Sequence, residues 1–307
     1  MADVQHRVQF DFEIEFTNGG SLHGEGFRLD IAGHDISDAE LIDHVVTDMR
    51  LLMAGPAWIR NKRIIVEAHK RGSADGLLRL DTGSGSRRYI DLSHVIEDGL
   101  VTYPGLPAAR VCDFLSREDS RKHYEAGTEF QIAKIEMVAN TGTYLDCPFH
   151  RYPHGDDLAQ VQPASFADLD GIVVRADHRH VDAIDASFFR DRELRGRAVL
   201  VHTGWDAHWA TPAYADGHPH LTEDAAIYLR DCGVALVGID SMNIDDTRGR
   251  SRPVHSILLG SGILIVEHLC NLGALPEEGF EFSAIPPKFR GVGTFPVRAM
   301  ARLQSAR

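Results

Sequence analysis

The stretch Asn140-Thr-Gly-Thr-Tyr144-Leu-Asp146-Cys-Pro148-Phe-His150 brings several chemically distinct residues together within eleven positions. Its Thr-Gly-Thr segment favours a turn, because glycine adopts backbone angles that other residues avoid. A carboxylate and an imidazole follow, with a proline between them. Asp146 alone could cap a turn, and His150 alone could be an ordinary histidine, but both side chains also bind metal ions and transfer protons. This stretch is therefore the first candidate for a functional site.

The sequence beyond this stretch alternates between short apolar runs and helical patterns. The runs lie at residues 171–174, 198–202, 234–240 and 263–267, bounded by glycine and charged residues. Apolar runs of this length are typical of strands that are buried on both faces. A helical pattern with an acidic first turn begins at Thr222. The mixture predicts an α/β domain with a largely buried, mixed sheet.

The N-terminal part of the chain has a different pattern. Residues 9–16 alternate between polar and apolar side chains, which indicates a strand with one buried face. An Asn-Gly-Gly turn signal leads into a second predicted strand at residues 21–31. Ser37 and Glu40 form a capping-box pattern at the start of a predicted helix. The apolar stripe of this helix consists of Leu41, Val45, Met49 and Leu52.

These patterns predict two units joined by a linker. Residues 1–72 are expected to form a small β-β-α unit, and residues 88–307 are expected to form the larger α/β domain. Residues 73–87 are rich in glycine, serine and other small or polar residues, which is typical of a linker. The length of 307 residues permits one large domain and one small one.

The composition excludes several classes of function. The formal net charge is −13, and an acidic chain repels the phosphate backbone of nucleic acids and anionic membrane surfaces. No apolar run approaches the roughly 18 residues of a membrane span, and the N-terminus lacks a signal-peptide pattern. The four cysteines show neither a CxxC pair nor zinc-finger spacing, so we expect reduced thiols. We therefore expect a cytoplasmic protein that acts on a small molecule, without nucleic-acid or membrane partners.

Residues 140–150 resemble the signature His-x-Gly-Thr-His-x-Asp-x-Pro-x-His of the metal-dependent cyclase/hydrolase family, which includes bacterial kynurenine formamidase and isatin hydrolase. Further segments resemble family segments in the family's order. They are Asp91-Leu-Ser-His94 with Thr102-Tyr-Pro-Gly-Leu-Pro107, His202-Thr-Gly-Trp205, Gly238-Ile-Asp240-Ser241, His255-Ser-Ile-Leu-Leu-Gly with Ile265-Val-Glu267-His, and Pro287-Lys with Pro296-Val-Arg298. The resemblance covers residues 88–303 and implies the family's swivelling β/β/α domain. It also implies a homodimer or a homotetramer.

The resemblance implies roles for several residues. In the family's two-metal form, the aspartate of the signature bridges two ions, and a distal His and Glu hold the second ion. The last His of the signature transfers protons. The bridging role falls on Asp146, the distal metal ligands fall on His255 and Glu267, and the proton-transfer role falls on His150.

The two remaining histidines of the family signature are replaced in this chain by Asn140 and Tyr144. An amide oxygen is a weak, neutral ligand, and a phenol with an ordinary pKa of about 10 binds a metal well only as phenolate. We therefore expect at most one divalent ion per site, zinc or manganese, held by Asp146, His255 and Glu267, or no ion.

The expected reaction is hydrolysis of a small amide, lactam or lactone, or the reverse ring closure. A divalent ion would polarise the carbonyl group and lower the pKa of water, with His150 as the acid/base and Tyr144 as a second catalytic group. The candidates for substrate binding are His94, Tyr103, Asn140 and Trp205.

Two other functions stay open at this stage. One is a metal-independent lyase, dehydratase or cyclase that uses His150 and Tyr144, because elimination needs less help from a Lewis acid than amide hydrolysis does. The other is a non-catalytic, ligand-binding member of the family. Structural roles are also open: His255 and Glu267 could be a buried ion pair, and Tyr144 could simply pack at a pocket wall.

Overall fold

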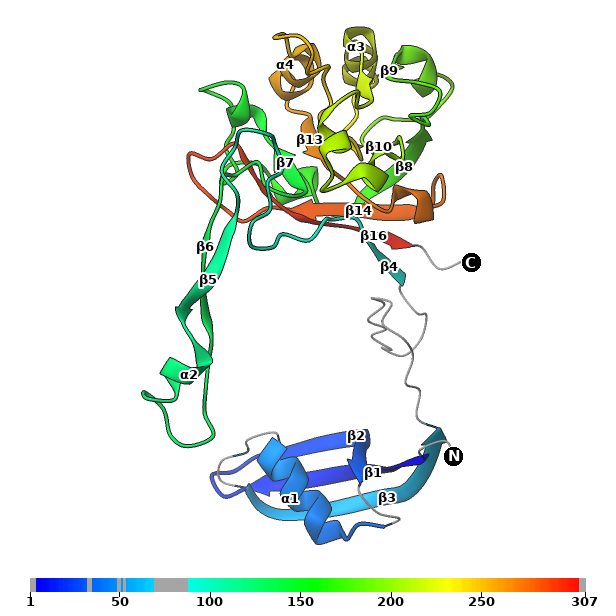
Figure 1. Cartoon of the computed structure of the whole chain (residues 1–307). Coiled ribbons are helices and arrows are strands. Elements are labelled where there is room, and N and C mark those ends of the chain that lie inside the picture. The colour runs from blue at the N-terminus through cyan, green and yellow to red at the C-terminus, as the bar shows by residue number, and fades with distance from the viewer. Residues whose placement is uncertain (1–3, 32–34, 49–50, 52–53, 69–87, 304–307) are drawn as a thin grey trace. The chain divides into compact units, whose positions relative to one another are not determined.

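The computed structural model describes residues 4–31, 35–48, 51, 54–68 and 88–303 (Figure 1). The chain divides into two compact units, Met1–Leu78 and Arg79–Arg307, and each unit has a core of its own. The predicted linker at residues 73–87 lies outside the described residues, so the predicted boundaries at residues 72 and 88 stay predictions. Within the described residues, none of the helices has the length and hydropathy that a membrane span requires.

The N-terminal unit is an antiparallel three-stranded sheet with one helix. The strands are β1 (Val4–Phe16), β2 (Ser21–Ile31) and β3 (Ala54–Ala68), in the order β2-β1-β3, and the helix is α1 (Asp38–Asp48). The two predicted strands and the predicted helix are confirmed, and β3 is an addition to the prediction. The pairing of β3 with β1 shifts register twice, and Asn61 has a φ of 52°. Such bulges break the period-two alternation that identifies a strand in a sequence.

The start of α1 has the predicted capping box. The Ser37 hydroxyl accepts a hydrogen bond from the Glu40 N–H at 3.2 Å, and the Glu40 carboxylate accepts one from the Ser37 N–H at 2.9 Å. Leu41 and Val45 of the predicted stripe are buried against alternate residues of β1, which are Val8, Phe10, Phe12 and Ile14. The other two stripe residues, Met49 and Leu52, lie outside the described residues.

The second unit is built on a nine-stranded mixed sheet in the order β15-β7-β13-β12-β10-β8-β14-β16-β4 (Figure 1). Its parallel centre consists of β8 (Leu169–Arg175), β10 (Ala198–His202), β12 (Leu236–Ile239) and β13 (Leu264–Glu267). The antiparallel outer strands are β4 (Arg88–Asp91), β7 (Tyr144–Asp146), β14 (Phe280–Ile285), β15 (Thr294–Pro296) and β16 (Arg298–Leu303). The predicted α/β class and mixed sheet are confirmed. The four predicted apolar runs are the central strands, which are covered on both faces and need no polar positions.

The central strands separate two cores, because successive side chains of a strand point to opposite faces. Leu200 of β10 belongs to the same core as Leu145 of β7 and Phe280 of β14. Because β7 and β14 are far apart in the strand order, the sheet curls over one of its own faces. Val199 belongs to the other core, which includes residues of the helices α3 (Glu223–Cys232) and α4 (Pro253–Gly260). The two helices lie side by side over this face (Figure 1).

Short elements connect the strands of this unit. The 3₁₀ segments are η1 (Pro148–His150), η2 (Pro163–Ser165), η3 (Ala186–Phe189), η4 (Trp205–His208), η5 (Pro212–Ala215) and η6 (Leu272–Ala274). A small parallel pair is formed by β9 (Ala183–Ile184) and β11 (His220–Leu221). Because η1 directly follows β7, it places His150 beside the strand that carries Asp146.

A two-stranded arm extends from this unit (Figure 1). It consists of β5 (Arg110–Leu115) and β6 (Ile132–Glu136), joined by a loop that contains the short helix α2 (Arg117–Ser120). Apolar side chains of both strands are exposed, including Phe114 at 75% and Ile135 at 59%. An isolated two-stranded hairpin has little stability of its own in water. The exposed apolar side chains therefore make the arm a candidate contact surface.

Candidate active site

The candidate site lies where β15, β7 and β13 pair side by side. The register aligns Tyr144 with Glu267 across β7 and β13, and it aligns Asp146 with Thr294 across β7 and β15. Residues 144 and 146 share one face of the sheet, because side chains two positions apart in a strand point the same way. The pairing brings four buried polar side chains onto one face, and a slip of one residue would turn them to the other face.

Two glycines allow the chain to enter this arrangement. Gly142 has a φ of 67°, a left-handed conformation that glycine adopts without strain, and its N–H donates to Thr102 Oγ1 at 2.8 Å. The following hydroxyl, that of Thr143, donates to the His268 carbonyl at 2.5 Å. Gly293 passes beside His150, where an added Cβ would overlap the His150 backbone nitrogen. The Thr-Gly-Thr segment thus sets the start of β7, and Gly293 leaves room for η1.

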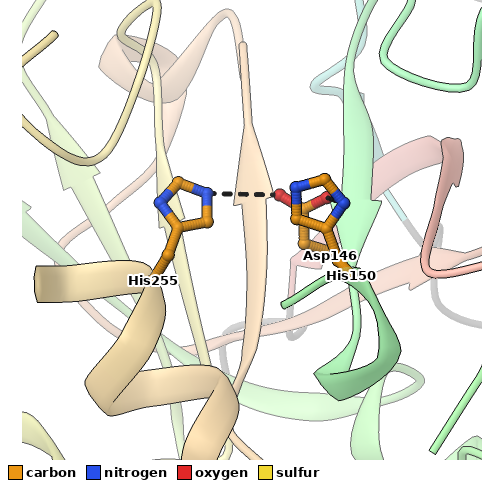
Figure 2. Close-up of side chains that lie close together, drawn as sticks. All are labelled: Asp146, His150 and His255. Atoms are coloured by element: carbon orange, nitrogen blue, oxygen red, sulfur yellow. Dashed lines mark ion pairs between the residues drawn. The ribbon is translucent and has the colours of Figure 1, made fainter. Parts of the chain in front are cut away.

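Asp146, His150 and His255 form the centre of the site (Figure 2). Each residue offers one ligand atom, and these atoms lie within 4.8 Å of one another. His255 comes from α4, and its Nε2 lies 3.6 Å from Asp146 Oδ2 and 3.7 Å from Glu267 Oε1. His150 comes from η1, and its Nδ1 lies 3.8 Å from Asp146 Oδ1. The group that could hold an ion therefore contains His150, to which the sequence assigned proton transfer, together with Asp146 and His255. The predicted ligand Glu267 is not part of this group, although its Oε1 lies 3.7 Å from His255 Nε2.

A threonine hydroxyl determines which nitrogen of His150 carries a proton. Thr294 Oγ1 is hydrogen-bonded to Asp146 Oδ1 and lies 2.7 Å from His150 Nδ1. An ionised carboxylate only accepts hydrogen bonds, so Thr294 donates its single proton to Asp146 and accepts one from the His150 Nδ1–H. The Nε2 of a neutral His150 is then the free acceptor of the ring. The His150 side chain is 35% exposed, so it is able to exchange a proton with a molecule in the pocket.

Asp245 orients His255. Its Oδ2 accepts hydrogen bonds from His255 Nδ1 at 2.6 Å and from the His255 N–H at 3.0 Å. The proton is thereby held on Nδ1, and Nε2 turns toward Asp146 and Glu267. Burial lowers the pKa of His255, but the carboxylates of Asp146, Asp245 and Glu267 outweigh burial and hold the pKa at about 10. Without a bound ion, the imidazole is therefore a cation surrounded by three carboxylates.

The Glu267 side chain is buried, since the residue is 1% exposed, and two hydrogen bonds hold its carboxylate. Its Oε2 accepts from the Tyr144 hydroxyl at 2.7 Å, and its Oε1 accepts from the Ile244 N–H at 2.7 Å. Burial raises the pKa of Glu267 to about 7 although the charge of His255 lowers it, and Asp146 raises it further. Positive charge beside Oε1 would favour the ionised carboxylate.

A donor chain of hydrogen bonds extends from Glu267 into the core through Tyr144, His268 and Tyr214. Because the Tyr144 hydroxyl donates to Glu267, its oxygen accepts from His268 Nε2 at 3.3 Å. His268 Nδ1 then accepts from the Tyr214 hydroxyl at 2.9 Å. Burial raises the pKa of Tyr144 well above its ordinary value and lowers the pKa of His268 well below its own. The donor chain is therefore neutral and donates in one direction, toward the carboxylate.

The donor atoms at the centre fit a divalent cation. Asp146 Oδ2 is buried and, among the described residues, has no hydrogen-bond partner. Ligand atoms about 2.0–2.2 Å from a common ion lie roughly 3.5 Å apart in a tetrahedral site. The distances of 3.6 and 3.7 Å from His255 Nε2 to Asp146 and Glu267 are close to that value. A carboxylate on the far nitrogen of a ligand histidine, as Asp245 provides, is a usual feature of metal sites.

The residues predicted for substrate binding lie in different surroundings. The Tyr103 hydroxyl reaches the site, since it donates to the Met242 carbonyl at 2.7 Å and lies 3.2 Å from the Tyr144 hydroxyl. The ring of His94 stacks on Trp209, with ring centroids 4.0 Å apart. These residues form an aromatic wall beside the donor chain.

Trp205 and Asn140 are less closely connected to the centre. The Trp205 ring packs against His178 and His208, and its Nε1 donates to the Tyr214 carbonyl. In the described part of the chain, Trp205 makes no hydrogen bond with Asp146 at the centre of the site. Asn140 is partly buried at the start of the turn that leads into β7. A substrate-binding role for these two residues stays a prediction.

Three residues that reach the site were not predicted: Asp245, Thr294 and His268. Asp245 lies ten residues before His255, Thr294 lies on a strand near the C-terminus, and His268 directly follows Glu267. An Asp-Asp pair, a Gly-Thr dipeptide and a Glu-His dipeptide occur in many proteins without function. Only strand pairing and the position of α4 give these residues their partners.

Comparisons with known proteins agree with the fold and with the resemblance of the signature. The family described as "Putative cyclase" matches residues 90–246. A kynurenine formamidase from Bacillus cereus is 26% identical over 215 residues, which are 70% of this chain and 97% of that protein. Kynurenine formamidase from Paracidovorax citrulli is 31% identical over 186 residues, which are 56% of this chain and 79% of that protein.

Solved structures share the fold of the second unit. Isatin hydrolase A from Labrenzia aggregata, bound to benzyl benzoate, superposes with a TM-score of 0.61 at 20% identity, over 71% of this chain and 94% of that chain. A protein described as a "Potential Metal-Dependent Hydrolase With Cyclase Activity" superposes with a TM-score of 0.59 at 22% identity, over 72% of this chain and 100% of that chain. The family match extends over half of the sequence and ends just after Asp245. This chain therefore belongs to the cyclase family.

Proposed function

We propose that this protein is a hydrolase that cleaves a small amide, lactam or lactone at a site with one divalent ion, zinc or manganese. Relatives of this chain carry the names formamidase and isatin hydrolase. A formamide contains an open-chain amide bond, and isatin contains a cyclic one. The observation that carries the proposal is the buried Asp146 Oδ2, which has no hydrogen-bond partner among the described residues and lies at ion-pair distance, 3.6 Å, from His255 Nε2.

Asp146, His255 and Glu267 would hold the ion. When bound, a divalent ion polarises a carbonyl group and lowers the pKa of water. Asp245 keeps the proton of His255 on Nδ1, so that Nε2 is the nitrogen directed at the site. Tyr144 and the Ile244 N–H hold the two oxygens of Glu267 in place. These contacts support a preformed ligand set rather than a loose acidic cluster.

His150 carries the proton in this proposal. Its free Nε2 accepts a proton from water while the water oxygen bonds to the carbonyl carbon of the substrate. His150 then returns the proton to the leaving nitrogen or oxygen as the C–N or C–O bond breaks. The products of a formamide are formic acid and an amine. The formic acid then ionises to formate and a proton, so atoms and charge balance. Thr294, which accepts from Nδ1, keeps the ring oriented through both transfers.

A single ion is proposed because the signature carries Asn140 and Tyr144 where the family has histidines. The Tyr144 phenol is 1% exposed, and burial raises its pKa well above the ordinary value. A neutral phenol is a poor ligand, and its proton is already donated to Glu267 at 2.7 Å. Tyr144 therefore acts as a positioning residue for Glu267 rather than as a donor to the substrate.

Ion content and turnover, measured on the same samples, test this proposal. Protein purified without chelator should contain about one zinc or manganese ion per chain by mass spectrometry and should hydrolyse formanilide, a neutral aryl formamide. Dialysis against a chelator should abolish turnover, and either ion should restore it. Asp146→Asn should lose both ion and activity, whereas Asp156→Asn, at an exposed neighbouring carboxylate, should lose neither.

The two alternative functions give different results in this experiment. Turnover that persists without any ion would favour a metal-independent lyase, dehydratase or cyclase that uses His150 and Tyr144. Ligand binding without turnover, unchanged in a His150→Ala variant, would favour a non-catalytic binding protein.

We also propose that the arm joins two copies of this chain into a homodimer. Residues 110–136 number 27, and one side of a stable interface contributes about 20–30 residues. The arm carries six acidic and five basic side chains, so two arms repel each other little although the whole chain has a net charge of −13. The exposed apolar residues of both strands supply the area that such an interface buries.

A further inference from the structure

A pocket of about 500 Å³ opens directly onto the candidate site. His150, Asn243 and His255 connect it to the centre. The remaining lining residues are Arg151, Arg250, Ser251, Arg252, Pro253 and Ser256. No aspartate or glutamate is among the lining residues. Asp146, Asp245 and Glu267 are at most 1% exposed, so the acidic groups of the site lie beneath the pocket rather than in its wall.

The three arginines of this pocket lack carboxylate partners among the described residues. Arg151 Nε donates to Ser256 Oγ at 3.2 Å, and its guanidinium lies 5.3 Å from the ring centroid of Tyr152. Arg252 Nη1 donates to three backbone carbonyls of its own loop, at 2.7 to 3.1 Å. Arg250, within the described part of the chain, forms neither a hydrogen bond nor an ion pair, and its side chain is exposed.

Several arginines elsewhere in the second unit pair with acidic side chains, although no ion pair is found for Arg110, Arg190 and Arg290 among the described residues. Arg197 Nη1 lies 3.0 Å from Glu278, and Arg248 Nε lies 2.9 Å from Asp246. The chain has 45 acidic and 32 basic side chains, so carboxylates are abundant. Among the described residues, the three guanidinium groups at this pocket have no acidic partner, and the pocket lining contains no acidic side chain. The pocket therefore has a local excess of positive charge in an acidic protein.

The N-terminus of α4 is not available to bind an anion in this pocket. The free N–H groups at a helix N-terminus attract anions, but those of Val254 and His255 already donate to Asp245 at 2.8 and 3.0 Å. The arginine side chains are thus the available anion-binding groups of the pocket. A guanidinium binds a carboxylate through parallel N–H donors, which gives both affinity and orientation.

We propose that the substrate carries a carboxylate and that Arg250, with Arg151 and Arg252, binds it while the scissile carbonyl lies between His150 and His255. The inference rests on the proposed hydrolase function and narrows its substrate class to small amides, lactams or lactones that bear an anionic group. Arg250 is the arginine most available to the ligand, because its N–H groups have no hydrogen-bond partner among the described residues.

A pair of substrates tests this inference. N-formylanthranilate is an aryl formamide with a carboxylate, and formanilide is its neutral counterpart. In the wild type, kcat/KM should be higher for the anionic compound. Arg250→Met should lower the ratio of kcat/KM for the anionic to the neutral substrate about tenfold or more, mainly through KM, the usual size of a charge-assisted contact. Arg248→Met, two residues away at an arginine paired with Asp246, should leave the ratio unchanged.

The outcomes separate this inference from the hydrolase proposal. If formanilide is hydrolysed and the ratio is the same in the wild type and Arg250→Met, the carboxylate site is wrong and the hydrolase proposal stands. If neither compound is hydrolysed, calorimetric titration with N-formylanthranilate decides. Binding that is lost in Arg250→Met and kept in Arg248→Met supports the carboxylate site, and binding that is absent or unaffected overturns it.

Discussion

At the residue scale, the site is a group of buried negative charges around one imidazole. Asp146, Asp245 and Glu267 all face His255, and burial of several carboxylates is costly unless positive charge accompanies them. A protonated His255 supplies one positive charge in the absence of an ion. A bound divalent ion would supply two, and His255 Nε2 would then be without its proton. Ion binding should therefore also stabilise the fold.

Removal of the Tyr144 hydroxyl tests the donor chain. Tyr144→Phe keeps the buried ring but leaves Glu267 Oε2 without its donor at 2.7 Å. We expect a folded protein with an affinity for zinc about 10–100-fold lower, the usual effect of losing a contact that holds a ligand. Calorimetric titration of zinc into chelator-treated protein measures this affinity. Tyr214→Phe removes a donor further along the donor chain and should lower the zinc affinity less. Equal affinities in the wild type and Tyr144→Phe would contradict the role of the donor chain.

The stacked His94 contributes to the pH dependence of stability. Burial lowers its pKa from 6.5 to about 4, although Asp206 opposes burial. Between these pH values the folded protein binds fewer protons than the unfolded chain. The contribution of His94 to the free energy of unfolding is therefore fully present above pH 6.5 and decreases as the pH falls toward 4. The full loss is at most about 3 kcal/mol.

A variant without the titrating ring isolates this contribution from that of other buried histidines. His94→Phe retains a ring to stack on Trp209. Urea denaturation at pH 7 and pH 4.5 should show a smaller loss of stability in His94→Phe than in the wild type. The same loss in both proteins would mean that His94 is protonated equally in the folded and unfolded states.

At the element scale, the position of β7 between β13 and β15 decides which side chains meet. This strand has three residues, and its ends are set by Gly142 and by η1. The helix α4 approaches the same side and adds His255, held by an aspartate from the loop that precedes the helix. No element carries the whole site, so the site forms only when strand pairing and helix packing are both complete.

The arm is the element on which assembly should depend. Replacing Phe114 and Ile135 by serine removes two of its most exposed apolar side chains, at 75% and 59% exposure. We expect the double variant to shift from dimer to monomer in size-exclusion chromatography with light scattering, because the interface loses apolar area. Ile285→Ser is a matched control, since Ile285 is 53% exposed on β14 outside the arm. An unchanged mass in the double variant would exclude the arm as the dimer contact.

At the scale of the whole molecule, each of the two units has its own hydrophobic core. The buried cluster of the N-terminal unit contains described residues between Val8 and Ile64, and the clusters of the second unit contain residues from Ile90 onward. The candidate site lies entirely within the second unit. We therefore expect the chemistry to proceed without the N-terminal unit.

A truncated chain tests this independence. A fragment of residues 88–307 should fold, bind the same ion with the same affinity, and unfold in a single thermal transition that is also seen in the full-length protein. Circular dichroism and calorimetry measure the transition. An insoluble fragment, or one with a weaker ion affinity, would show that the N-terminal unit supports the second unit.

The sequence by itself determined the class of the fold and the central strands, because buried parallel strands and capped helices leave local patterns of polarity. It also identified Asp146, His150, His255 and Glu267 as candidates, through the order and spacing of the segments that resemble the family. It missed β3, because bulges interrupt the alternation in that strand. These features depend on residues that are close together in the sequence, so they can be recognised from the sequence alone.

The tertiary structure alone decided which groups act on one another. Thr294 meets Asp146 across 148 positions of sequence, and Tyr144 meets Glu267 across 123. The tautomer of His150 and the charge of His255 follow from such contacts, and only the folded structure shows that Arg250 has no partner among the described residues. Hydrogen bonds and electrostatic shifts depend on distances of a few ångströms in a buried environment, and those distances exist only once the strands have paired and α4 has packed against them.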